Sequence, residues 1–107
     1  MTEFLVEVER DSVCMGDDCA APHAYSFKVS INSTLSDVFE HLARKRYLAS
    51  VAGKNHSWEA VIKNNPVAFF KGNNQVPEPS AVLSDKVSLY AINATLKIWF
   101  KYNSAVS

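Results

Sequence analysis

The residues best suited to chemistry lie in one short stretch, DSVCMGDDCAAPH, at positions 11–23. Cys14 and Cys19 stand in C-x4-C spacing, and His23 follows the second cysteine. Thiolate sulfur and imidazole nitrogen are ligands of tetrahedral zinc sites, and two neighbouring thiols can form a redox-active disulfide. The stretch therefore offers four alternatives: a metal site, a thiol-redox pair, a loop that binds a partner, or only a turn.

The surrounding residues argue against metal and redox chemistry. The C-x4-C spacing is at the wide end of zinc-finger practice, and no second pair of Cys or His residues follows. The negative charge of Asp17 and Asp18 opposes ionisation of the neighbouring thiols and slows thiolate chemistry. We therefore expect no cofactor. A metal-binding or thiol-redox protein that uses Cys14, Cys19 and His23 remains the alternative function.

A turn is the simplest explanation of this stretch. Gly16 can adopt a positive φ, and the two aspartates can accept hydrogen bonds from nearby backbone amides. However, the stretch is longer than a hairpin requires, and two apolar side chains lie near its tip beside carboxylates. Partner binding therefore ranks second, ahead of metal binding. Its predicted contact residues are Val13, Met15, Asp17 and Asp18.

Length and charge restrict the class of protein. A chain of 107 residues, 48% of them hydrophobic, fits one domain with one core over residues 1–107. Eleven basic residues balance eleven acidic ones, so we expect no nucleic acid as a partner. Apolar runs such as 66–70 are far shorter than the ~20 residues that span a bilayer, and MTEFLVEVER does not resemble a signal peptide. We therefore expect no membrane contact and a cytoplasmic location.

Two strands are predicted on either side of the opening stretch. Residues 4–9 and 25–31 both alternate apolar and polar side chains, which is the period of a half-buried strand. No helical period separates them, so we expect an antiparallel hairpin whose tip is residues 11–23. The side chains predicted to face inward are Phe4, Val6, Val8, Tyr25, Phe27, Val29 and Ile31.

A helix is predicted after the second strand. Ser33 or Thr34 can cap it, and Asp37 stands in capping-box position relative to Thr34. Glu40 and Arg44 are four residues apart, which suits an ion pair on the exposed face. The apolar residues recur at helical spacing: Leu35, Val38, Phe39, Leu42 and Ala43.

The remaining sequence predicts two further hairpins. Residues 58–63 and 66–71 form the strands of one, with a turn at Asn64 and Asn65. After a polar loop at 72–80, residues 87–92 and 95–103 form the other.

Trp99 is the second candidate contact residue. The last strand alternates, so Trp99, Lys97 and Lys101 share its outward face. An exposed tryptophan would be an anchor for a protein partner, because tryptophan is enriched at binding hot spots. The favoured expectation is nevertheless that a second layer or the Tyr90 side chain buries Trp99.

The order of these elements over residues 3–103 resembles that of the ubiquitin-like β-grasp fold. The resemblance implies an α+β fold, with a mixed sheet of five or six strands and one helix packed across one face. It also implies that the last strand pairs parallel to the first, between it and a later edge strand. The inward residues of 96–102 would then meet Phe4, Val6 and Val8.

Several functions of the β-grasp fold do not match these residues. Ubiquitin-type modifiers and sulfur carriers end in Gly-Gly, whereas this chain ends Ala-Val-Ser at 105–107. Ferredoxins of the same fold share the C-x4-C spacing of Cys14 and Cys19, but their third cysteine is replaced here by Pro22 and no other cysteine exists. The role that the resemblance leaves is a protein-binding module.

The sequence therefore predicts a non-enzymatic protein-interaction module. Its protein partner would contact the loop at 11–23 or the strand face around Trp99. A hydrolytic site cannot be assembled around His41 or His56, since no acid and nucleophile can be placed beside either. An edge strand in either hairpin also offers a site for pairing with a second copy of the chain.

Overall fold

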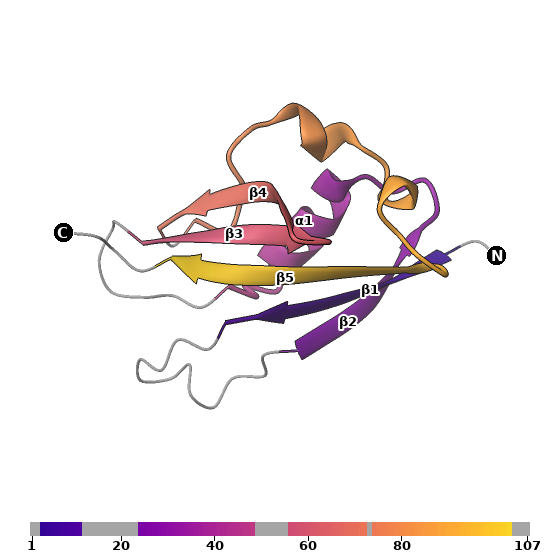
Figure 1. The fold of residues 1–107 in the computed structure, drawn as a ribbon, viewed down its shortest axis with the longest axis horizontal. Helices are drawn as coiled ribbons and strands as arrows, with labels where there is room; N and C mark the ends of the chain where they lie inside the picture. Colours follow the sequence, from indigo (N-terminus) through magenta and orange to yellow (C-terminus); the bar gives the residue numbers. More distant parts are fainter. Residues whose placement is uncertain (1–2, 12–23, 49–55, 73, 104–107) are drawn as a thin grey trace.

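A computed structural model describes residues 3–11, 24–48, 56–72 and 74–103, which form an α+β fold (Figure 1). Its α-helix is α1 (Leu35–Arg44), and two short 3₁₀ helices are η2 (Ala81–Ser84) and η3 (Val87–Leu89). The strands are β1 (Glu3–Arg10), β2 (Ala24–Ser30), β3 (Ser57–Ile62), β4 (Asn65–Lys71) and β5 (Thr95–Asn103).

The five strands form one mixed sheet in the order β2-β1-β5-β3-β4. β5 lies in the centre, parallel to β1 and antiparallel to β3, and the other neighbours are antiparallel. The predicted hairpin of β1 and β2 and the predicted parallel pairing of the first and last strands are confirmed. The expectation that an edge strand flanks β5 is wrong, because β3 lies beside β5 and β4 forms the edge.

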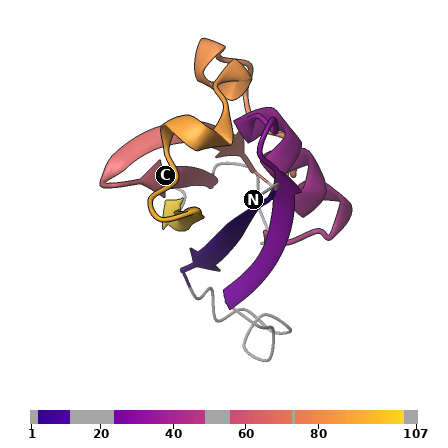
Figure 2. The same ribbon diagram turned by 90° about the vertical axis from the view of Figure 1, so that its right-hand side faces the viewer.

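The helix covers one face of this sheet, and the core lies between them. In Figure 1 α1 is seen behind the sheet, and in the turned view of Figure 2 it lies to one side of it. The predicted register is confirmed, with Val6 opposite Leu96 and Val8 opposite Ile98. Ile31, expected inward, is exposed because β2 ends at Ser30 and the chain turns there. The largest fully buried side chains are Trp58, Phe39, Phe70, Phe100, Leu35, Leu96, Val6, Val8, Val38 and Val87.

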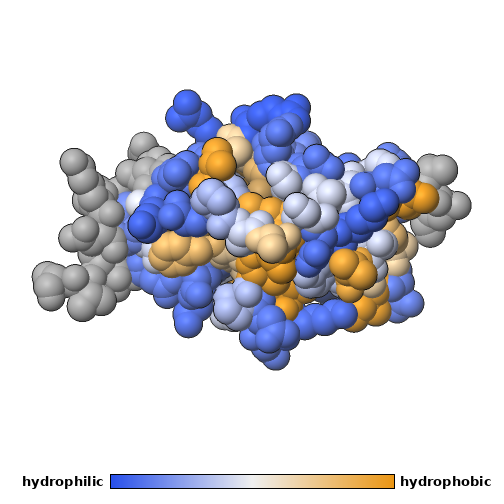
Figure 3. All heavy atoms as spheres, turned by 90° about the horizontal axis from the view of Figure 1, so that it is seen from above, coloured by the Kyte–Doolittle hydropathy of each residue, from blue (hydrophilic) through white to orange (hydrophobic). Residues whose placement is uncertain are grey.

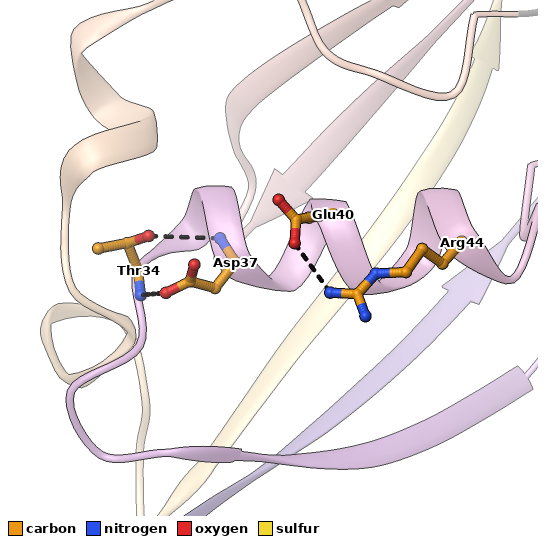
Figure 4. A network of polar contacts seen from close by, with 4 residues as sticks. All are labelled: Thr34, Asp37, Glu40 and Arg44. Atoms are coloured by element: carbon orange, nitrogen blue, oxygen red, sulfur yellow. Dashed lines mark hydrogen bonds and ion pairs between the residues drawn. The ribbon is translucent and has the colours of Figure 1, made fainter.

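The helix begins at the predicted capping box (Figure 4). The backbone of Thr34 is extended, and its Oγ1 accepts a hydrogen bond from the Asp37 N–H at 3.3 Å. Asp37 Oδ2 accepts the Thr34 N–H at 2.9 Å in return. One turn later, Arg44 Nη2 and Glu40 Oε1 form the predicted ion pair at 2.8 Å. The capping box of Thr34 and Asp37 fixes the start of the helix that covers the sheet.

The turn between β3 and β4 lies one residue earlier than predicted. Lys63 and Asn64 form it, with φ angles of 52° and 68°, and Asn65 is the first residue of β4. Positive φ at both central residues is the mark of a type I′ hairpin turn, whose twist matches that of the strands it joins. The pairing also shifts between Ala60 and Val61, which marks an irregularity in β3.

The predicted hairpin of 87–92 with 95–103 is wrong. Val87 begins the 3₁₀ helix η3, and its N–H donates to the Ser33 carbonyl at 2.9 Å. Ile92 forms only an isolated bridge with Thr95. The physical reason is that β1 and β3 take both hydrogen-bonding sides of β5, so no side of β5 is left for residues 87–92.

Candidate functional site on the open face of the sheet

Only one of the predicted contact residues lies in the described part of the chain. Trp99 is on β5. The predicted loop contacts Val13, Met15, Asp17 and Asp18 lie outside the described residues, as do Cys14, Cys19 and His23 of the alternative. The candidate site is therefore built from the sheet face that carries Trp99.

Strand alternation places Trp99 on the side of the sheet opposite the helix. Its neighbours Ile98 and Phe100 are buried in the core, whereas Trp99 is 52% exposed. The expectation that a second layer or Tyr90 buries Trp99 is wrong. The Tyr90 hydroxyl instead donates to Asp85 Oδ2 at 2.6 Å, which raises the pKa of Tyr90, and no described element covers this face.

Asp11, the residue after β1, holds the Trp99 ring in place. Trp99 Nε1–H donates to Asp11 Oδ1 at 3.0 Å, and the Tyr102 N–H donates to Asp11 Oδ2 at 2.9 Å. The Asp11 N–H donates to the Phe100 carbonyl at 2.9 Å. One carboxylate thus joins the end of β1 to two positions on β5. Sequence reasoning missed Asp11, because the residues that bind its side chain are 88 and 91 positions away.

Other apolar side chains, among them Val61 and Phe69, share this side of the sheet. Val61 on β3 lies opposite Trp99 and is half-buried. Phe69 on β4 is 39% exposed, while its neighbours Ala68 and Phe70 are buried. Together with the charged side chains of the same side, these residues make up what we call the Trp99 face: Trp99, Val61, Phe69, Glu7, Glu9, Glu59, Lys97 and Lys101.

The charges of the Trp99 face alternate from strand to strand. β1 contributes Glu7 and Glu9, β5 contributes Lys97 and Lys101, and β3 contributes Glu59. In the register, Glu7 stands opposite Lys97, and Glu59 stands opposite Lys101. Opposite charges in cross-strand positions favour the pairing of the strands. They also surround the apolar centre with both signs of charge.

A shallow depression crosses the Trp99 face. It has a volume of about 780 Å³, and its lining includes Glu7, Lys97, Trp99 and the turn residues Lys63 and Asn64. A neighbouring depression of about 610 Å³ shares Glu7, Lys63 and Lys97. Binding surfaces combine an apolar centre, which loses its water on binding, with a polar rim. In this depression Trp99 is the apolar centre and charged side chains surround it.

The other exposed apolar side chains do not belong to the Trp99 face. Ile31 follows β2, and Val76, Leu89 and Ile92 belong to the segment 74–92. Ile92 lines the neighbouring depression. Figure 3 shows the side of the molecule that carries this segment, where apolar areas are interspersed with polar ones. Scattered exposed apolar side chains are normal on protein surfaces. Trp99 differs from them because a carboxylate orients its ring.

His41 packs against β2. Its Nε2 lies 3.0 Å from the Tyr25 hydroxyl, and its ring stacks on Phe27 with centroids 4.0 Å apart. Burial, followed by the charges of Lys45 and Arg44, lowers the pKa of His41. The contact that orients His41 is thus a phenol, whereas a catalytic base of the His-Asp type is oriented by a carboxylate.

Metal-binding clusters and membrane-spanning helices are both absent from the described residues. No group of three or more His, Cys, Asp and Glu side chains within them is arranged to hold a metal ion. α1 has ten residues, and nowhere in the described ranges is there a helix long and apolar enough to cross a membrane.

Comparison of the chain with protein-family models, curated protein sequences and solved structures finds no match. The geometry of the Trp99 face is therefore what supports a function.

Proposed function

We propose that the chain is a ubiquitin-like β-grasp domain that binds a partner protein through the Trp99 face and catalyses no reaction. The strand order β2-β1-β5-β3-β4 and the parallel pair of first and last strands support the fold assignment. The single α-helix of the described residues, α1, follows β2 and covers one face of the sheet, which supports the assignment as well. Such a sheet leaves its other face available for contacts.

The observation that carries the proposal is the exposed but anchored ring of Trp99. A tryptophan that is 52% exposed keeps a large apolar area in water, which a partner can bury. Its hydrogen bond to Asp11 limits the orientations of the ring before binding. Binding then loses less side-chain entropy than it would with a freely rotating ring.

The charges define the partner that fits this face. An apolar side chain would pack on Trp99, acidic groups would face Lys97 and Lys101, and basic groups would face Glu7 and Glu9. Because these charges lie around the apolar centre, they would set the orientation of the partner and its rate of association more than its affinity.

The proposal is tested by capture of partners with the wild-type protein and with Trp99→Ala, followed by binding measurements with the purified partner. Leu89→Ala is the matched control, because Leu89 is 67% exposed and lies outside the Trp99 face. We expect Trp99→Ala to weaken binding about 30-fold or more, as for a hot-spot residue that contributes about 2 kcal/mol. We expect Leu89→Ala to bind as the wild type does.

Two results would contradict this proposal. One is a partner whose affinity is the same for Trp99→Ala and Leu89→Ala. The other is a set of amide chemical-shift changes, on addition of the partner, that spares β5 and β3. A Val13→Ser/Met15→Ser variant tests the predicted loop contacts separately, and loss of binding in that variant alone would move the site to residues 11–23.

A further inference from the structure

The two edges of the sheet differ in how they are protected. At the β4 edge, the Glu78 N–H donates to the Phe69 carbonyl at 2.7 Å, and Glu78 also pairs with Lys71 at 3.8 Å. β4 further contains Pro66, which has no N–H to offer. Covering chain, charge and proline are the means by which proteins prevent edge strands from pairing with other chains.

The β2 edge has no covering segment among the described residues, and Lys28 is its one charged side chain. Its seven residues pair with β1 without a shift, and it contains no proline. The Leu5 N–H donates to the Ala94 carbonyl, so the odd-numbered residues of β1 bond towards β5 and the even-numbered ones towards β2. The β2 residues that stand opposite even-numbered residues of β1 are Tyr25, Phe27 and Val29, so their N–H and C=O groups bond to β1. The N–H and C=O groups of Ser26 and Lys28 consequently point away from the sheet.

We propose that two copies of the chain pair antiparallel along β2, with Phe27 opposite Phe27 of the second copy. This register makes all seven residues of β2 overlap, since Ala24 then stands opposite Ser30 and Ser26 opposite Lys28. The outward N–H and C=O groups of Ser26 and Lys28 in each strand meet those of the other. The result is one continuous sheet through both copies.

Charge supports this register. Lys28 forms no ion pair within the described ranges, and Glu7 stands opposite Ser26 on β1. In the dimer, Ser26 would lie between Glu7 of its own chain and Lys28 of the second copy. The backbones at Glu7 and at that Lys28 would be two strand spacings apart, about 9.6 Å. Lysine and glutamate side chains on the same face can meet over a small serine, and the symmetry creates two such pairs.

Other symmetric registers fit less well. A two-fold axis at Lys28 would place the two lysines directly opposite one another, and such like-charge pairs are destabilising. An axis at Ser26 would pair only residues 24–28 of β2. The axis at Phe27 also places half-buried aromatic rings in a cross-strand pair on the helix side, which favours pairing.

Sedimentation equilibrium of the full chain over a concentration series tests the dimer. Ser26→Pro removes an outward N–H, whereas the bonds to β1 run through Tyr25, Phe27 and Val29 and are retained. We expect a monomer–dimer equilibrium for the wild type and for the control Ser26→Ala, and a dissociation constant at least about tenfold higher for Ser26→Pro, equal to about 1.4 kcal/mol. A wild type that remains monomeric up to millimolar concentration overturns the proposal.

A charge-reversal experiment tests the register and does not depend on proline. Lys28→Glu alone and Glu7→Lys alone each bring like charges together in the homodimer, so each should dimerise more weakly. An equimolar mixture of these two variants should form a heterodimer close to wild-type affinity, because both trans pairs are then of opposite charge. Failure of the mixture to recover dimerisation overturns the register. Glu7 belongs to the Trp99 face as well, so dimerisation is measured on the purified chain, without a partner at that face.

Discussion

Phe100 and Trp99 are adjacent on β5, but Phe100 lies on the side that the helix covers and Trp99 lies on the open side. Phe100 is 1% exposed, and its ring centroid lies 5.6 Å from Tyr47, 5.8 Å from Phe70 and 6.2 Å from Phe39. Trp99 has one hydrogen bond from its ring and an exposed face. The difference shows that the helix layer, rather than residue hydrophobicity, decides which aromatic side chain stabilises the fold.

The sharpest test of this comparison is truncation at each of the two positions. We expect Phe100→Ala to lower the free energy of unfolding by about 3–5 kcal/mol, because it removes a ring from a packed core. We expect Trp99→Ala to lower it by at most about 1 kcal/mol, since half of the ring is already in water. Urea denaturation followed by circular dichroism measures both. Equal losses of unfolding free energy in the two variants would show that Trp99 stabilises the fold as much as Phe100 does.

Alkaline pH should affect the covered side through Tyr47. Burial raises the pKa of Tyr47 to about 12, although the nearby charge of Arg10 acts in the opposite direction. Above the ordinary pKa of about 10, the unfolded tyrosine loses its proton while the folded one retains it. Stability is therefore full below pH 10 and falls as the pH rises towards 12.

The control for this effect is Tyr47→Phe, which keeps the ring and removes the titrating hydroxyl. The loss of stability between pH 10 and 12, measured by thermal unfolding at each pH, should be smaller in this variant. The effect should remain below that of Phe100→Ala because Tyr47 is only half-buried. A loss equal to that of the wild type would assign the pH dependence to other groups.

On the covered side, the helix cap is expected to have the smallest effect on the free energy of unfolding. Thr34→Ala removes the oxygen that accepts the Asp37 N–H and should lower the free energy of unfolding by about 1 kcal/mol. Thr34→Ser keeps that oxygen and should stay close to the wild type. Chemical denaturation of the three proteins measures the difference. If Thr34→Ser loses as much as Thr34→Ala, methyl packing matters more than the cap.

Sequence alone predicted the elements that local patterns define. Alternation identified β1, β2 and β5, and the spacing of Thr34 and Asp37 identified the start of α1. Residues 87–92 were predicted to form a strand, because apolar alternation is the same in sequence whether or not a neighbouring strand is available to pair with them. Whether one is available depends on the partners of β5, which are far away in sequence.

The candidate site was predicted only in part for the same reason. Strand alternation placed Trp99 outward, but its exposure depended on whether another layer covers that face, which no local pattern reveals. The role of Asp11 follows from the parallel register that sets Arg10 beside Phe100. Such a register joins segments about ninety positions apart, and their spacing along the chain carries no signal of it.

The central position of β5 has a consequence for how the protein is made. The hairpins β1–β2 and β3–β4 each form from nearby residues, but the sheet joins them only through β5. During synthesis the residues of both hairpins emerge from the ribosome before residues 95–103, so at that stage β1 and β3 lack β5 as a neighbour. Such long-range closure slows folding and exposes strand edges to aggregation. Folding of this sheet therefore depends on a late step, and chaperones that shield strand edges would act before that step.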